Sequence, residues 1–263
     1  MSYQTLLFEV ADRVATITLN RPQSYNALDP LMARELMDAS IRCDEDPAIR
    51  CVVLTGAGDK AFCAGGDLRS FKADPRGLPS TVKEVTAHLH AAVSRFSRMN
   101  APIIGAINGV AAGAGLSLAA SVDLAIAADT ARFVSAYTAA GLSPDGSSTY
   151  FVPRLIGLRR YLEFAMTNRS LTAQEAAEWG IVNNVVPAAA LKDEVMTLAR
   201  QLADGPTAAY GRLKQLAHNS FAETLESQME LEARLVADCV RGADGREGVD
   251  AFLSKRKPVF TGA

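Results

Sequence analysis

The feature that most constrains the fold is the order in which short β-type runs and helical stretches follow one another. Over residues 1 to about 190 they alternate, which favours parallel strand pairing with helices packed outside the sheet. Because the strands are short and unevenly spaced, an α/β spiral of ββα turns fits this pattern better than a regular barrel. The strand-like runs are residues 6–10, 14–20, 51–56, 101–108, 122–128 and 131–136. A break at Ala11-Asp12 makes the first two an expected hairpin.

The pattern changes at about residue 191, where four helical stretches with apolar residues at three- and four-residue spacing begin. They cover residues 191–203, 206–221, 223–240 and 244–256. We therefore predict a ββα core over residues 1–190 and a helical region over residues 191–263. Several apolar helix faces often support oligomer contacts, although packing onto the protein's own core explains them equally well.

Composition narrows the function classes. A net charge of −2 gives no electrostatic reason to expect nucleic acid or an anionic membrane as a partner. No apolar run approaches the roughly 20 residues of a membrane span, and residues 1–13 carry two acids and no basic segment typical of a signal peptide. The four cysteines have no CxxC spacing, which is typical of reduced thiols, so we expect a cytoplasmic protein. Three histidines and no HExxH motif make a metal site an unfavoured interpretation.

Two glycine-rich stretches could bind a ligand: FCAGGDL (residues 62–68) and NGVAAGAG (residues 108–115). Each follows a strand-like run and opens into a helical one, so its free N–H groups can hold negative charge. Two such donors from different loops, aimed at one point, form an oxyanion hole. A dinucleotide fingerprint is not matched, because Leu118 stands where the last glycine of GxGxxG belongs. Tight packing alone explains either loop equally well.

A third stretch, GLSPDGSSTYF (residues 141–151), places one carboxylate among small residues. Locally, Ser143 suits a helix N-cap, Pro144 the first helical position and Asp145 the first turn, where the helix dipole favours negative charge. A functional interpretation of Asp145 needs a site around it.

Several motifs, in order and correctly spaced, supply such a context. They are NRPQSYNALD, FCAGGDL, NGVAAGAGLSLAASVDLAIAAD, ARFVSAYTAAGLSPDGSSTYFVPRLIG, SLTAQEAAEWGIVNNVV and REGVDAFLSKRKPVFTG. Together they resemble the enoyl-CoA hydratase/isomerase (crotonase) superfamily nearly from end to end. The resemblance implies a spiral ββα fold with a C-terminal helical trimerisation region, hence a homotrimer or a hexamer. It also implies an acyl-CoA thioester substrate, with coenzyme A as part of the substrate and no permanently bound cofactor.

The resemblance also assigns roles to residues. It implies an oxyanion hole formed by the N–H groups of Gly66 and Ala114, which suits a thioester enolate because preformed amide dipoles stabilise its charge without reorganising. The CoA arm is expected to lie along two segments. These comprise Ser24, Asn26, Ala27, Ala64, Gly65, Asp67 and Leu68.

The acid/base residues depart from the hydratase pattern. Hydratases of the superfamily use two glutamates, at positions that match Ser117 and Tyr137 here. Between residues 100 and 150 the acids are Asp123, Asp129 and Asp145, with no glutamate. This argues against an ordinary hydratase.

Asp145 instead resembles the single catalytic aspartate of two subfamilies. In the ring-epoxide and double-bond isomerases of phenylacetyl-CoA breakdown it would take a proton from one carbon and return it to another. In the 4-chlorobenzoyl-CoA dehalogenases it would attack an aromatic carbon and form an ester that water hydrolyses.

His90 is the residue that distinguishes between these two subfamilies. It lies beside Thr86 at the margin of an apolar helical stripe, which is typical of a half-buried structural histidine. Its position nevertheless matches the histidine with which dehalogenases activate water. Tyr137 stands where those enzymes carry a tryptophan that hydrogen-bonds the aspartate, and its hydroxyl is either a substitute donor or part of the core.

We therefore expect an enoyl-CoA isomerase of fatty acid or aromatic acid catabolism, with Asp145 moving the proton. The alternative is a dehalogenase-like enzyme or thioester hydrolase with Asp145 as nucleophile and His90 as base. A hydratase with atypical residues comes third. A non-catalytic acyl-CoA binder stays open as a different class, whereas the near-neutral charge counts against an RNA-binding relative.

Overall fold

The strands form two sheets that the chain visits alternately. The computed structural model describes residues 3–263. The larger sheet has the order β1-β2-β3-β5-β7-β10. Its strands are β1 (Leu6–Ala11), β2 (Val14–Leu19), β3 (Cys51–Gly56), β5 (Ile103–Ile107), β7 (Leu124–Ala128) and β10 (Asn184–Val186). The first pair is antiparallel, so the expected hairpin is confirmed, and every other pairing in this sheet is parallel.

The smaller sheet has the order β4-β6-β8-β9, from β4 (Ala61–Cys63), β6 (Val110–Ala112), β8 (Arg132–Val134) and β9 (Leu171–Thr172). Each of β3, β5 and β7 is followed by a strand of this second sheet and then by helix. The predicted spiral of ββα turns is therefore confirmed. The sequence interpretation missed β4, because its three residues lie inside a run that reads as a glycine-rich turn.

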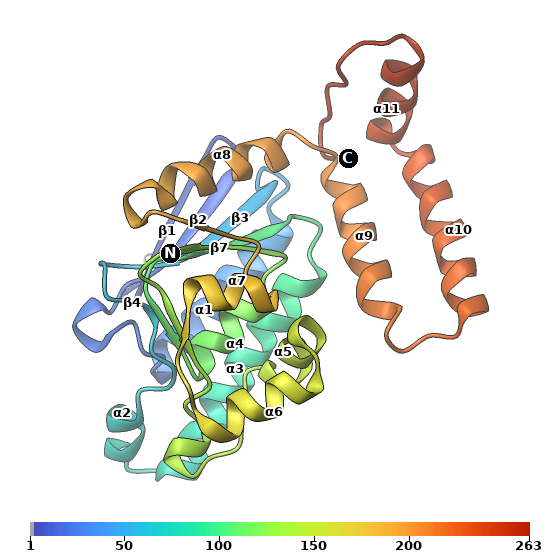
Figure 1. Cartoon of the computed structure of the whole chain (residues 1–263). Helices are drawn as coiled ribbons and strands as arrows, with labels where there is room; N and C mark the ends of the chain where they lie inside the picture. The colour runs from blue at the N-terminus through green and yellow to red at the C-terminus, as the bar shows by residue number, and fades with distance from the viewer. Residues whose placement is uncertain (1–2) are drawn as a thin grey trace.

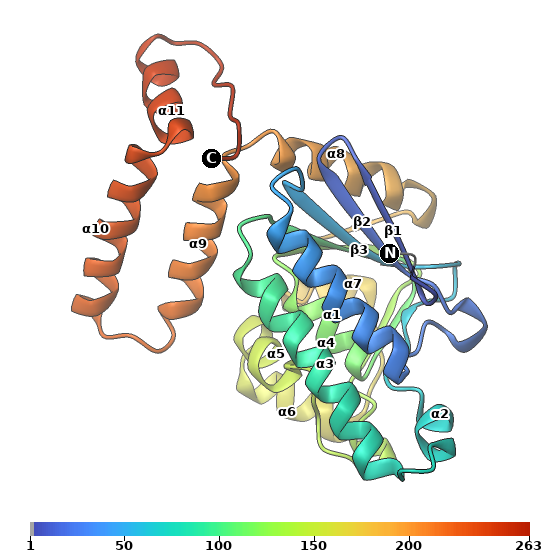
Figure 2. The same ribbon diagram turned by 180° about the vertical axis from the view of Figure 1, so that it is seen from behind.

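Helices cover the sheets on two sides. Helices α1 (Pro30–Glu45) and α3 (Leu78–Arg98) run side by side on one face (Figure 2). Helix α4 (Ala114–Ser121) is buried along its whole length, in a core that includes Leu89 and Phe133. On the other face, α8 (Leu191–Ala203) lies across the larger sheet and forms a separate apolar cluster with it (Figure 1). The remaining helices of the body are α2 (Leu68–Ala73), α5 (Ser148–Ile156), α6 (Leu158–Thr167) and α7 (Ala173–Trp179).

Helices α9 (Thr207–Asn219), α10 (Leu225–Arg241) and α11 (Ala243–Leu253) stand beside this body (Figure 1). A buried ion pair of 2.8 Å between Lys214 Nζ and Asp123 Oδ2 ties α9 to it. Helix α10 exposes the apolar side chains of Leu225, Met229, Val236 and Val240. Since α8 packs on the sheet, α9–α11 are the part of the helical region that leaves the body. The boundary at residue 191 and the oligomerisation role remain predictions.

Within residues 3–263, none of the helices combines the length and the apolar character needed to cross a membrane.

Candidate active site

The two glycine-rich loops touch each other. A Cβ atom built on Gly65 would lie 2.9 Å from the Ala112 carbonyl oxygen and 3.4 Å from the Ala114 nitrogen. Gly65 and Gly113 both have positive φ angles, 98° and 52°, a conformation that glycine adopts without strain. The turn after β4 and the start of α4 therefore approach as closely as they do because side chains are absent there.

The contact brings together the N–H groups of Gly66 and Ala114. Gly66 is exposed, and Ala114 is the first residue of α4, so its N–H has no intrahelical acceptor. Within the described residues 3–263, neither group donates a hydrogen bond to the protein. Two unused donors on touching loops are compatible with the predicted oxyanion hole, and that role remains a prediction.

Asp145 does not lie in a helix, so the helix-capping interpretation is wrong. Helix α5 begins at Ser148, after Ser147 with a φ of 78° and no capping hydrogen bond. Tertiary contacts override the local capping signal, because the peptide group after Asp145 is held from outside. The hydroxyl of Ser117 donates to the Asp145 carbonyl oxygen at 2.9 Å, and the Gly146 N–H donates to His90 Nε2 at 3.1 Å.

The Asp145 carboxylate is oriented by two hydroxyl groups. Tyr137 Oη donates to Oδ1 at 2.5 Å, and Thr86 Oγ1 donates to Oδ2 at 3.1 Å. No lysine, arginine or histidine within residues 3–263 forms an ion pair with it. Burial, together with the neighbouring Asp145 charge, raises the pKa of Tyr137 well above its usual range, so the phenol stays protonated and keeps donating.

Ser117 and Tyr137 also meet each other, with 3.3 Å between the two hydroxyl oxygens. By the resemblance, these are the positions at which hydratases carry glutamates. Both hold hydroxyl groups here, and both contact Asp145. Asp145 thus supplies the carboxylate of this cluster.

The next residue, Gly146, fits into a space that has no room for a side chain. Its φ is 61°, and an added Cβ would lie 2.9 Å from Ser117 Cβ and 3.1 Å from Leu89 Cδ2. A larger residue would force the side chains of Ser117, on α4, and Leu89, on α3, to shift. The loop that carries Asp145 is therefore locked between these two helices.

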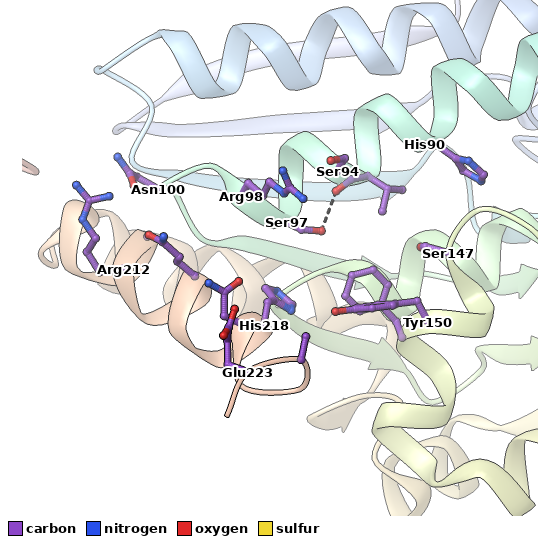
Figure 3. A pocket seen from close by; sticks show the side chains of 16 residues that line it. His90, Ser94, Ser97, Arg98, Asn100, Ser147, Tyr150, Arg212, His218 and Glu223 are labelled. Atoms are coloured by element: carbon purple, nitrogen blue, oxygen red, sulfur yellow. Dashed lines mark hydrogen bonds between the residues drawn. The ribbon is translucent and has the colours of Figure 1, made fainter. Parts of the chain in front are cut away.

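His90 is exposed and lies between the Asp145 loop and a cavity of about 710 Å³. Residues of α3, α5 and α9 line this cavity; His90 and Ser147 lie toward one end, and Asn100 and Arg212 toward the other (Figure 3). Asp145, Gly66 and Ala114 are not among the lining residues. The cavity is therefore adjacent to the carboxylate without including it.

In the predicted CoA-binding segments, some side chains are already engaged within the protein. Asn26 is fully buried and donates to the Ala57 and Ala61 carbonyl oxygens at 2.9 and 2.8 Å. Its amide therefore shapes the loop and is not available to a ligand. Asp67 pairs with Arg21 at 2.9 Å. Burial raises the pKa of Asp67, but the hydrogen bond from Ser70 N–H and the pairing with Arg21 outweigh it, and the pKa lies below its usual value.

The remaining members of the predicted set form the surface of the two segments. Ala64 and Leu68 are exposed, Ser24 is half-buried, and Ala27 and Gly65 are buried. Their contact with CoA remains a prediction. Within residues 3–263 there is no cluster of three or more histidine, cysteine, aspartate or glutamate side chains arranged to hold a metal ion.

Sequence reasoning did not assign a role to Thr86 or foresee that Ser117 would contact Asp145. The available signal for Thr86 was its spacing of four residues from His90, which puts both on one helix face. Only the packing of α3 against the loop brings that face to Asp145.

Comparisons with known proteins agree with this architecture. The sequence model of the family described as enoyl-CoA hydratase/isomerase matches residues 9–263. The chain is 41% identical to the 1,2-epoxyphenylacetyl-CoA isomerase of Escherichia coli K12, covering 98% of each protein. It is 37% identical to 4-chlorobenzoyl coenzyme A dehalogenase-2 of an Arthrobacter species, covering 94% of this chain and 90% of that one.

Among solved structures, the enoyl-CoA hydratase of Bacillus anthracis superposes with a TM-score of 0.92 at 31% identity, covering 99% of this chain and 100% of that one. The fold is thus the crotonase fold. The chain belongs to the enoyl-CoA hydratase/isomerase family, and it is an acyl-CoA enzyme of the crotonase superfamily.

Proposed function

We propose that this protein is an enoyl-CoA isomerase in which Asp145 moves a proton between two carbons of the acyl group. The observation that carries the proposal is the hydroxyl-lined setting of Asp145: Tyr137 and Thr86 each donate to one carboxylate oxygen. The similarity to a protein named 1,2-epoxyphenylacetyl-CoA isomerase supports the same class of chemistry.

The mechanism needs one acid/base group and one anion-binding site. The N–H groups of Gly66 and Ala114 would hold the thioester oxygen, and Asp145 would remove a proton from C2 of a 3-enoyl-CoA. The electron pair moves into a dienolate whose oxygen charge the two N–H groups stabilise. The protonated Asp145 then returns its proton to C4, so that the double bond moves to C2–C3 and the carboxylate is regenerated.

The surroundings of Asp145 suit this cycle better than hydration. Adding water requires one group to activate the water and another to supply a proton. The hydroxyl groups that donate to Asp145 are those of Ser117, Ser148, Thr86 and Tyr137, and the raised pKa of Tyr137 makes that phenol a poor proton donor. A carboxylate that takes a proton and gives it back needs no second acid.

The alternative is aromatic substitution, in which Asp145 attacks a ring carbon, displaces chloride and forms an aryl ester that water hydrolyses. The similarity to a 4-chlorobenzoyl-CoA dehalogenase favours this alternative. So does the position of His90, which contacts Gly146, the residue after Asp145. However, His90 Nε2 already accepts the Gly146 N–H, so that nitrogen has no lone pair free to activate water.

We further propose that the chain works as a homotrimer or a dimer of trimers in a reducing, cytoplasm-like compartment. The exposed apolar side chains of α10 support the first statement, and the four free cysteines support the second.

The deciding experiment incubates the protein with 2- and 3-enoyl-CoAs, a ring-epoxide CoA and 4-chlorobenzoyl-CoA. We expect double-bond migration that Asp145→Asn abolishes, because the amide keeps the shape and loses the basic oxygen. Asp193→Asn is the matched control: Asp193 is an exposed residue of α8, and this variant should keep full activity. Release of chloride with a 4-hydroxybenzoyl product would instead establish the alternative.

A further inference from the structure

One peptide group beside the proposed catalytic carboxylate is held at both of its polar atoms. This group consists of the Asp145 carbonyl and the Gly146 N–H. Ser117 Oγ, from α4, donates to the carbonyl oxygen at 2.9 Å. His90 Nε2, from α3, accepts from the N–H at 3.1 Å. Two helices that meet at this loop thus fix the orientation of the peptide plane.

The contact defines the chemical state of His90. A ring nitrogen that accepts a hydrogen bond carries no proton, so the neutral ring has its proton on Nδ1. In this state Nε2 cannot take a proton from water or substrate without first releasing Gly146. The geometry therefore gives His90 a structural task that competes with a role as base.

The orientation of this peptide plane affects the carboxylate directly. The plane contains the Asp145 Cα atom, so holding the plane restricts the position of the atom from which the side chain starts. Gly146 has a φ of 61° and lies against Ser117 and Leu89, so the backbone after Asp145 has little room to move between α4 and α3. Tyr137 and Thr86 hold the carboxylate oxygens, and His90 holds the backbone from which the side chain starts.

We propose that His90 is a positioning residue that aims Asp145 by accepting the Gly146 N–H. The proposal rests on the proposed function of Asp145. It gives His90 the same task whichever thioester is the substrate, and it predicts that an acceptor atom at the Nε2 position is what the reaction requires.

Three substitutions at residue 90 separate positioning from base catalysis. In His90→Gln the side-chain oxygen reaches the place of Nε2 but cannot act as a base. In His90→Asn the oxygen reaches only as far as Nδ1, and His90→Phe keeps a ring without an acceptor. We expect kcat of the Gln variant to stay within about threefold of the parent. The Asn and Phe variants should lose about five- to tenfold in kcat, the effect of one lost neutral hydrogen bond, with little change in KM.

His88→Gln is the matched control, because His88 is on the same helix and its contact is with Glu84. It should leave kcat unchanged. If His90→Gln loses as much activity as His90→Phe, an acceptor at this position is insufficient and the positioning role is overturned.

A measurement without substrate tests the same contact independently. The chain has three histidines, so ¹⁵N-histidine labelling gives three rings, and the His90→Gln variant identifies the signals of His90. We expect the His90 ring at neutral pH to have a proton on Nδ1 and an unprotonated, hydrogen-bonded Nε2. A proton on Nε2 would overturn the proposal. If no CoA ester is turned over, the proposed function fails while this spectrum still reports on His90.

Discussion

Tyr137 donates its phenol hydrogen to Asp145 Oδ1 over 2.5 Å, which is the shortest contact that the proposed catalytic carboxylate makes. The two residues are eight positions apart; Tyr137 directly precedes the 3₁₀ turn Thr138–Ala140, and Asp145 is on the loop before α5. The phenol therefore fixes the orientation of one carboxylate oxygen.

Tyr137→Phe should lower kcat by about ten- to a hundredfold, because a hydrogen bond to a charged group contributes roughly 1.5–3 kcal/mol. Steady-state rates on the enoyl-CoA that the wild type converts give the effect. Tyr3→Phe is the matched control. Tyr3 also donates to a carboxylate, that of Asp38 at 2.7 Å, and neither residue belongs to the candidate site. Equal kcat values for Tyr137→Phe and the wild type would show that the Tyr137 hydroxyl does not contribute to catalysis.

Thr86 makes the second contact, at 3.1 Å to Oδ2. Thr86→Val removes the hydroxyl at nearly constant volume, and kcat should fall about fivefold, as expected for one hydrogen bond of ordinary strength. Thr86→Ser keeps the hydroxyl and should be close to wild type. A Thr86→Val variant with the kcat of the wild type would show that this hydrogen bond does not contribute.

The buried pair of Lys214 and Asp123 should dominate the attachment of α9. Lys214→Met leaves the Asp123 carboxylate without its cation and should lower the free energy of unfolding by about 3 kcal/mol. Adding Asp123→Asn should recover part of this loss, since no uncompensated charge then stays buried. Urea unfolding of both variants at one fixed protein concentration measures the difference; an additive double variant would show that the two charges do not interact.

Three of the four cysteines should be chemically inert. Burial raises the pKa of Cys43, Cys51 and Cys63 to about 12, so at pH 8 almost none of each is thiolate. Iodoacetamide at pH 8 should therefore modify Cys239, which is half-buried, and reach the others only in denaturant. Peptide mass spectrometry gives the site of modification, and labelling of native Cys63 would show that the loop beside Gly66 opens.

The sequence predicts the fold well where periodicity is long, and less well where tertiary contacts decide. The predicted helix over residues 191–203 coincides with α8, because its apolar spacing and its length both match an amphipathic helix. Strand β4 escaped notice because Ala61–Cys63 is too short to show alternation. Only pairing with β6 makes it a strand.

The candidate site shows the same limit. Asp145 was singled out from its family context, whereas its local sequence predicted a helix start at Ser143. The chain instead starts α5 at Ser148, because Ser117 and His90 use the peptide group that follows Asp145. Thr86 has no sequence signature of its own, since only the packing of α3 against the loop brings this threonine into contact with Asp145.

The lack of space for a side chain at Gly146 also bears on attempts to change the substrate specificity of this enzyme. Mutant libraries that randomise the segment around Asp145 should leave codon 146 untouched, since any Cβ there lies within 3.1 Å of Ser117 and Leu89. Exposed positions such as Leu142 and Ser143 tolerate variation better, because new side chains there can extend into solvent without disturbing the contacts that hold Asp145.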